Sequence, residues 1–347
     1  MEKIRLDEYG RYTDVVWLGG GGTSKVFRAY DTRLHKMVAI KVVKDVTIAM
    51  QEAKILRGLE DKRIPYLIDC YSYQEQTVLV MQYIEGMTMT QYFTKYQEVT
   101  EREIHHFLWE LISILQLLHG QKIPILYLDL KPDNIIIGSD KQLYLIDFGA
   151  ARYQYYEDSS VSLYGTAGYA PKELIEYEQE KVLDVRSDIY SLGMVAIYMR
   201  TGVGEDDIAN EMVRKHLREY VISKKFQKVI VKCVQEDKEK RYANIKEVEY
   251  HMKQVQLSKY VNQIVVLFTQ GLYGIFLLGV AGYVGMVLSQ MNLLEIEQYT
   301  TEIGRCTILG MVLLLYRIIV IQRFAIRRKP YRQVTHMMLI GKKGVLL

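Results

Sequence analysis

Hydrophobic and polar residues alternate in short runs along the first part of the chain, which is the pattern of half-buried β-strands. Such runs cover residues 12–18, 25–30, 36–43, 67–73 and 77–83. The last two flank a polar Gln-Glu-Gln turn and predict a β-hairpin. The first part of the chain is therefore predicted to be rich in β-structure.

After residue 100 the period of the pattern becomes helical. Thr100 and Glu103 have the spacing of a capping box, in which each side chain bonds to the other residue's backbone N–H at a helix start. Apolar residues then recur every three or four positions, as on the buried face of a helix. They are Ile104, Phe107, Leu108, Leu111, Ile112, Leu115 and Leu118. We expect an α+β arrangement, with a β-rich lobe followed by a helical lobe.

A different pattern begins at Tyr260, because the next 35 positions, counted from that residue, carry no charge. About 20 apolar residues suffice to cross a bilayer, and residues 262–288 exceed that length. A buried core helix is the alternative. Residues 305–322 form a second apolar run, in which Arg317 lies close enough to one end to reach the headgroups. We expect a two-helix transmembrane hairpin with a short external loop at residues 289–304.

The net charge of +4 is unevenly distributed. From Tyr260 onward there are nine Lys/Arg and three Glu, so the preceding residues have a small acidic excess. A nucleic-acid binder carries its positive charge on the folded domain, so no nucleic-acid partner is expected. The positive-inside rule places the basic tail, residues 323–347, and the N-terminal part in the cytosol. We expect a two-span protein of the cell membrane, with the lipid bilayer as a partner and a homodimer formed through the hairpin.

The cysteines favour neither a disulfide framework nor a zinc site. Cys70, Cys233 and Cys306 are far apart in the chain, and no CxxC pair is present. The N-terminal residues are charged from position 2 and lack the apolar stretch of a secretory signal peptide. Both observations agree with a reducing, cytosolic environment for the N-terminal part.

A glycine-rich stretch, LGGGGTSKV at residues 18–26, joins the first two predicted strands. Glycines allow a tight turn and bring backbone N–H groups close to phosphates without an obstructing Cβ. A flexible hairpin turn has the same composition, so this stretch alone leaves both interpretations open. A Walker A loop is excluded, because no Gly-Lys-Ser/Thr sequence follows.

Lys41 ends an apolar VAIK sequence on a predicted strand, and Glu52 lies on a predicted helix. Such a lysine is either a solvent-facing residue or a cation that reaches nucleotide phosphates and is held by a carboxylate. Three further motifs decide between these alternatives. They are DLKPDN at residues 129–134, DFG at 147–149 and GTAGYAPKE at 165–173.

In this order and spacing, the motifs resemble those of eukaryotic-type (Hanks-type) serine/threonine protein kinases of the bacterial kind. The resemblance covers residues 12–254 and implies a bilobal kinase fold. The N-lobe is expected at residues 12–82 and the C-lobe at 87–254.

The resemblance implies catalytic roles for five residues. Asp129 would orient the substrate hydroxyl and accept its proton, and Lys131 would stabilise the transferring phosphoryl group. Thr166 would contact both of these residues and shape the site for Ser/Thr substrates. Asn134 and Asp147 would bind Mg²⁺, or Mn²⁺ in its place.

The resemblance also implies an ATP site. Lys41 would contact the phosphates while paired with Glu52. Met81 would be the gatekeeper, and the backbone of Gln82 and Ile84 would pair with the adenine base. The other residues implied to contact the nucleotide are Leu18, Gly19, Gly20, Gly21, Gly22, Thr23, Ser24, Lys25, Val26 and Ala39.

Two further contacts are implied in the helical lobe: an ion pair between Glu173 and Arg241, and a contact from Asp188 to the catalytic-loop backbone. The sequence departs from the family pattern at Tyr127-Leu128, where His-Arg is usual. Without that arginine a phosphorylated loop has no partner at this place, so the resemblance is to the non-RD kinases. Activation by loop phosphorylation is correspondingly in doubt.

Six groups are needed for catalysis in this family, and all are present: Lys41, Glu52, Asp129, Lys131, Asn134 and Asp147. We therefore expect an active membrane-anchored kinase that transfers the γ-phosphate of ATP to Ser/Thr hydroxyls of proteins. The alternative is a nucleotide-binding pseudokinase or scaffold at the membrane, which typically lacks one of these groups. A small-molecule phosphotransferase is a third reading, against which the peptide-positioning segment around Thr166 argues.

Overall fold

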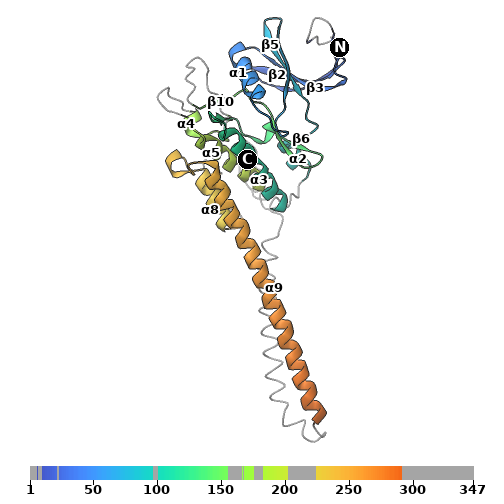
Figure 1. Ribbon diagram of the computed structural model, residues 1–347, viewed down its shortest axis with the longest axis vertical. Helices are drawn as coiled ribbons and strands as arrows, with labels where there is room; N and C mark the ends of the chain where they lie inside the picture. The colour runs from blue at the N-terminus through green and yellow to red at the C-terminus, as the bar shows by residue number, and fades with distance from the viewer. Residues whose placement is uncertain are drawn as a thin grey trace, which may run out of the picture. The chain divides into compact units, whose positions relative to one another are not determined.

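The computed structural model describes residues 6, 10–21, 23–96, 101–154, 166, 168–175, 183–201 and 224–290. These residues fall into two compact units, the first extending to His251 and the second beginning at Met252. The first unit contains a sheet-rich N-lobe and a helical C-lobe, as expected from the sequence (Figure 1).

A five-stranded antiparallel sheet with the order β1-β2-β3-β5-β4 forms most of the N-lobe. Each predicted strand is confirmed to within two residues at either end. The strands are β1 (Tyr12–Gly20), β2 (Ser24–Asp31), β3 (Lys36–Val43), β4 (Leu67–Tyr73) and β5 (Gln76–Gln82).

The β4–β5 hairpin has a two-residue turn, one residue shorter than predicted. Tyr73 pairs with Gln76 across it. The two turn residues, Gln74 and Glu75, have φ values of 48° and 61°. Positive φ at both positions is what a type I′ turn requires, and this turn matches the twist of the flanking strands. The favoured residues for such a turn are Asn and Gly, so the Gln74-Glu75 sequence did not predict a two-residue type I′ turn.

Helix α1 (Val46–Arg57) packs on one face of the sheet (Figure 1). It begins at Asp45, whose carboxylate accepts hydrogen bonds from the backbone N–H groups of Thr47 at 2.8 Å and Ile48 at 3.2 Å. This cap satisfies two of the donors left free at a helix start. The face of α1 that is turned inward is apolar apart from Glu52, which is therefore a buried acid.

The C-lobe is built around two long helices, α3 (Glu101–His119) and α5 (Arg186–Thr201), which contact each other. The predicted apolar face of α3 is buried throughout. The capping-box prediction depends on Thr100, which lies outside the described residues. The remaining elements are β6 (Gly86–Thr88), α2 (Met89–Lys95), β7 (Ile125–Leu126), η1 (Pro132–Asn134), β8 (Ile135–Gly138), β9 (Leu143–Leu145), β10 (Arg152–Tyr153), α4 (Lys172–Ile175), α8 (Lys224–Cys233) and η2 (Lys238–Lys240).

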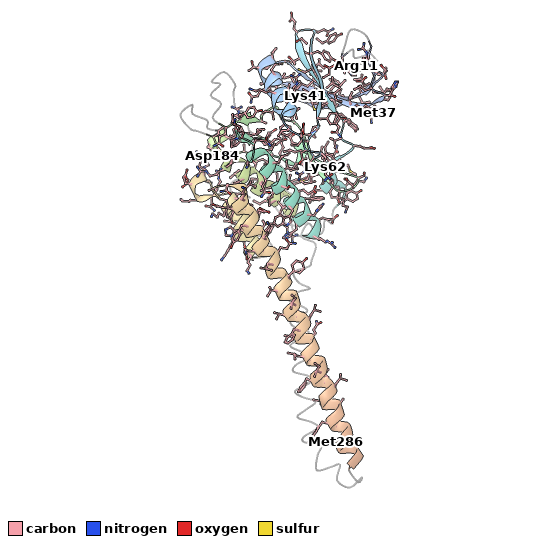
Figure 2. All side chains as sticks on the ribbon, in the orientation of Figure 1. Arg11, Met37, Lys41, Lys62, Asp184 and Met286 are labelled. Atoms are coloured by element: carbon pink, nitrogen blue, oxygen red, sulfur yellow. The ribbon has the colours of Figure 1, made fainter. Side chains whose placement is uncertain are left out.

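The last described helix, α9 (Ile245–Gln290), includes a segment long and apolar enough to cross a membrane, Ile264–Met286. Its mean hydropathy is 2.1, and its side chains project from the helix without being buried (Figure 2). It is the one such segment among the described residues. The first predicted span is thus helical, but its helix begins well before residue 262. The second predicted span, at 305–322, and the tail at 323–347 lie outside the described residues.

Candidate active site

Lys41, on β3, is at the centre of an ion cluster that joins the N-lobe to the DFG segment. Figure 2 labels Lys41 in the N-lobe. Its Nζ lies 2.6 Å from Glu52 Oε2 on α1 and 2.6 Å from Asp147 Oδ1, in the segment after β9. The predicted Lys41–Glu52 ion pair is therefore confirmed. Glu52 also accepts a hydrogen bond from the backbone N–H of Phe148 at 3.2 Å. The cluster thus joins a strand, a helix and the DFG segment.

The charges of this cluster compensate one another. Burial lowers the pKa of Lys41, but the negative charges of Asp147 and Glu52 outweigh burial and raise it above the ordinary value. Burial raises the pKa of Asp147, but the charge of Lys41 outweighs it, and the resulting pKa is below the ordinary value. The pKa of Glu52 is raised, chiefly by its burial. Lys41 and Asp147 accordingly remain charged at neutral pH.

Gly149 leaves the room that this cluster needs. A Cβ at this position would lie 3.0 Å from Lys41 Nζ and 3.2 Å from Asp147 Oδ1. The backbone N–H of Gly149 donates to Asp147 Oδ1 at 3.2 Å. The backbone N–H therefore orients the carboxylate, and the absence of a side chain at Gly149 leaves space for the ammonium group of Lys41.

The second group of predicted residues surrounds Asp129. Thr166 Oγ1 donates to Asp129 Oδ1 at 2.7 Å, and Lys131 Nζ donates to Thr166 Oγ1 at 2.7 Å. Lys131 Nζ also lies 3.0 Å from Asp129 Oδ2. Asn134 Nδ2 donates to Asp129 Oδ2 at 2.8 Å and to the Asp129 carbonyl at 2.9 Å. Both carboxylate oxygens of Asp129 are thus held by protein donors.

The oxygen atoms of Asn134 and Asp147 suit a divalent cation. The amide nitrogen of Asn134 is committed to Asp129, which leaves its oxygen as the available ligand atom. In Asp147 the bonds from Lys41 and Gly149 both go to Oδ1. Oxygen ligands of this kind fit Mg²⁺, which usually takes one or two protein carboxylates and completes its shell with phosphates and water. Among the described residues no group of three or more His, Cys, Asp or Glu could hold a metal on its own.

The backbone before Asp129 is held by Asp188 of α5, as predicted. Its carboxylate accepts hydrogen bonds from the N–H of Tyr127 at 2.9 Å and of Leu128 at 2.8 Å. His119 Nε2 lies 2.8 Å from the same carboxylate. Leu128 has a φ of 65°, a left-handed conformation that is unfavourable for leucine. The bonds to Asp188 are what maintain this conformation next to Asp129.

Tyr127 links the catalytic loop to the DFG segment. Its side chain is fully buried, and its hydroxyl donates to the carbonyl of Ile146. Its ring lies edge-on to Phe148, with the centroids 5.2 Å apart. Burial raises the pKa of Tyr127 well above its ordinary value, so the hydroxyl stays neutral and remains a donor.

The described residues among those predicted to contact the nucleotide lie on β1, β2, β3 and β5 or in the connections after them. Gly20 needs to be a glycine, since a Cβ there would lie 2.7 Å from the Ser24 carbonyl. That carbonyl accepts the N–H of Gly21 at 3.0 Å, which closes the turn. Gly22 lies outside the described residues. The N–H of Gln82 donates to the Tyr66 carbonyl at 3.0 Å, so this N–H is not available for the predicted pairing with a base.

The predicted ion pair in the helical lobe is also present. Arg241 donates to both oxygens of Glu173, at 2.5 and 3.0 Å. Its guanidinium lies over the ring of Tyr190, 4.8 Å from the centroid. A bidentate pair of this kind has a fixed geometry, so it orients the segment that carries Glu173.

The comparison with known protein families agrees with this geometry. The family model described as "Protein kinase domain" matches residues 12–261, well over half of the chain. This chain belongs to the protein kinase domain family. The match covers all residues assigned above to the ion cluster, the catalytic loop and the glycine-rich turn.

Kinases of bacteria are among the similar curated proteins. The chain is 26% identical over 262 residues to "Probable serine/threonine-protein kinase PknB" of Lactococcus lactis, covering 69% of this chain and 41% of that protein. It is 30% identical over 279 residues to "Serine/threonine-protein kinase B" of Synechocystis (71% and 46%). It is 26% identical over 265 residues to "Serine/threonine-protein kinase PrkC" of Bacillus subtilis (70% and 40%). The aligned part of this chain thus spans less than half the length of each of these three relatives.

Two contacts of this kinase domain were not predicted from the sequence. His119 contacts Asp188 from the end of α3, although the scattered histidines of the chain gave no indication of a role. Gln51 Nε2 donates to the carbonyl of Ala151 at 2.6 Å, a second link between α1 and the segment after DFG. Both join residues far apart in the chain, and neither belongs to a motif with a characteristic spacing.

Proposed function

We propose that this protein is an ATP-dependent serine/threonine protein kinase of bacterial signalling. The observation that carries the proposal is the simultaneous assembly of two groups. Lys41 is paired with both Glu52 and Asp147, and Asp129 is held by Lys131 and Thr166. Each contact requires a different segment of the chain to be in place, and a protein without phosphoryl transfer has no need for all of them together.

In the proposed reaction the acceptor hydroxyl approaches Asp129, which orients it and takes its proton. Lys131 lies beside Asp129 and would stabilise negative charge on the γ-phosphoryl group while its bond to the leaving group, ADP, breaks and a bond to the acceptor oxygen forms. Lys41 holds the phosphates of ATP, and Glu52 fixes the position of its ammonium group. These residues would therefore accelerate the reaction by positioning the acceptor and the nucleotide and by stabilising the negative charge on the transferring phosphoryl group.

Asn134 and Asp147 are proposed to hold Mg²⁺, with Mn²⁺ as a substitute, through their oxygen atoms. When bound, the ion neutralises charge on the phosphate oxygens of the nucleotide. The lowered pKa of Asp147 keeps its carboxylate ionised and ready for this role.

The adenine base is proposed to lie between the glycine-rich turn and the segment after β5. Leu18, Val26 and Ala39 would contact its faces, and Gln82 and Ile84 would pair with its edge. The glycine-rich turn at residues 19–25 would cover the phosphates.

Ser/Thr side chains are proposed as acceptors because of Lys131 and Thr166. The bond between them places a short hydroxyl side chain directly on Asp129. An acceptor of similar length fits this arrangement, and the names of the bacterial relatives agree with it.

We further propose that α9 anchors the kinase in the cell membrane through Ile264–Met286. Residues 305–322 would return the chain across the bilayer and leave both the kinase domain and the tail in the cytosol. Homodimerisation through the two spans is part of this proposal.

Phosphate transfer from γ-labelled ATP to protein, measured with the full chain in detergent micelles, tests the function. We expect Asp129→Asn and Lys41→Ala each to lower the rate by about 10²- to 10⁴-fold, the range for removing a proton acceptor or a charge-stabilising group. Lys36→Ala is the matched control, because Lys36 lies on the same strand but donates to Tyr66. ATP binding by the wild type without transfer would identify a pseudokinase instead.

A further inference from the structure

The residues that follow Asp147 form a tight turn. The backbone N–H of Ala151 donates to the carbonyl of Phe148 at 3.0 Å, which closes residues 148–151 into a β-turn, called the DFG turn below. The two end groups that this bond does not use are the N–H of Phe148 and the carbonyl of Ala151. Ala151 is fully buried, and buried backbone carbonyls are almost always paired with a donor.

Two neighbouring residues of α1 bind these two end groups. Glu52 Oε1 accepts from the N–H of Phe148 at 3.2 Å, and Gln51 Nε2 donates to the carbonyl of Ala151 at 2.6 Å. One side chain supplies an acceptor and the other a donor, so α1 is joined to both ends of the DFG turn. Glu52 also pairs with Lys41 through its other oxygen. A shift of α1 relative to the turn therefore disturbs this ion pair as well.

The contact continues one helical turn further along α1. Lys54 lies three residues after Gln51 and hence on the same face of the helix, with its Nζ 5.6 Å from the ring centroid of Tyr153. Tyr153 pairs with Ile125 in the β10–β7 ladder, and β7 directly precedes the catalytic loop. Gln51 thus binds the segment that runs from Asp147 to a strand beside the catalytic loop.

We propose that Gln51 is a positioning residue of the kinase reaction. Through the carbonyl of Ala151 it fixes the DFG turn to α1. This contact keeps Asp147 on the ammonium group of Lys41 while Glu52 holds the same group from the helix. Without the Gln51 donor, the buried carbonyl loses a hydrogen bond, and helix and turn are joined at one end only. The inference rests on the kinase activity proposed above and adds a residue to its machinery.

Hydrogen–deuterium exchange of the full chain in detergent micelles, measured by mass spectrometry, tests the contact itself. Gln51→Met keeps the length of the side chain but removes the donor. We expect it to speed exchange in residues 147–154 by about 2- to 10-fold, the equivalent of one hydrogen bond. Gln116→Met is the matched control, because Gln116 Nε2 donates to Glu249 at 2.9 Å elsewhere in the same unit. Wild-type exchange of residues 147–154 in Gln51→Met, or an equal increase in Gln116→Met, overturns the inference.

Steady-state phosphate transfer from ATP to a protein substrate tests the role of the contact, at a temperature at which all variants are folded. We expect Gln51→Met to lower kcat by roughly 10- to 100-fold, as a displacement of reacting groups by about 1 Å does. Gln51→Glu keeps the shape of glutamine but turns an acceptor toward the Ala151 carbonyl, so its kcat should fall at least as far. Gln116→Met should keep the wild-type kcat.

A wild-type kcat in both Gln51 variants overturns the inference, and so does an equal loss of kcat in Gln116→Met. If the wild type itself transfers no phosphate, the proposed function fails. The exchange result then decides alone whether Gln51 holds the DFG turn to α1.

Discussion

The two carboxylate oxygens of Asp188 accept hydrogen bonds from three buried donors. Replacing Asp188 by asparagine removes one of these two acceptor oxygens. The backbone N–H of Leu128 donates to Oδ1, while the N–H of Tyr127 donates to Oδ2 and His119 Nε2 contacts Oδ2. In Asp188→Asn an NH₂ group must face at least one of these donors, and an unsatisfied buried donor costs about 1–3 kcal/mol. The bonds that remain lose their charge assistance, which is worth about 0.5–1 kcal/mol each. The free energy of unfolding should therefore fall by about 2–5 kcal/mol.

Thermal unfolding of the full chain in detergent micelles, followed by tryptophan fluorescence, measures this effect. For a domain of this size about 1 kcal/mol corresponds to about 2–4 °C in Tm, so a decrease of roughly 5–20 °C is expected. Asp237→Asn is the control, since the exposed Asp237 carboxylate accepts from the N–H of Glu239 at 3.0 Å and lies 3.6 Å from Lys240 Nζ, an exposed pair of little strength. Its change should stay below about 1 kcal/mol. Equal shifts in the two variants would refute the anchoring role of Asp188.

Three other variants test particular contacts. Gly193→Ala places a Cβ 2.6 Å from Val234 Cγ1, and this overpacking should lower stability by about 1–3 kcal/mol in the same unfolding assay. Glu173→Gln leaves the buried guanidinium of Arg241 without its charged partner, so stability should fall by about 3–5 kcal/mol. Asp147 has a lower pKa in the folded protein than unfolded, so its contribution to stability is complete above about pH 4 and is lost as the pH falls through the folded pKa. Asp147→Asn should therefore flatten the acid side of the stability profile, and an unchanged profile would contradict the lowered pKa.

The active-site pairs could be predicted because their residues belong to motifs. Lys41 and Glu52 are eleven residues apart, on a strand and a helix whose periods are visible in the sequence. Of the contacts around the catalytic loop, the family resemblance implied the one from Asp188 to the loop backbone, but it did not imply others. His119 lies 69 residues from Asp188, and Leu128 belongs to one buried apolar cluster with the later residues Leu174 and Leu183. Such contacts depend on how helices pack, and no local pattern records them.

The beginning of the apolar helix was missed for a related reason. The hydrophobic run identifies residues that can lie in lipid, and it does begin near residue 262. The helix itself begins at Ile245, because residues 245–261, which come before the apolar run, are amphipathic and form the same pattern of backbone hydrogen bonds. The hydropathy of a segment indicates whether it can lie in lipid. The length of a helix is set by its backbone hydrogen bonds, which can extend beyond that segment.

The hydroxyl of Thr166 already donates a hydrogen bond to Oδ1 of Asp129, the carboxylate to which the proposed reaction brings the acceptor. If that proposal holds, an incoming serine or threonine would replace one alcohol by another of similar hydrogen-bonding strength. Binding of the acceptor hydroxyl itself would then be nearly neutral in free energy. Discrimination among target proteins would come from the substrate residues on either side of it.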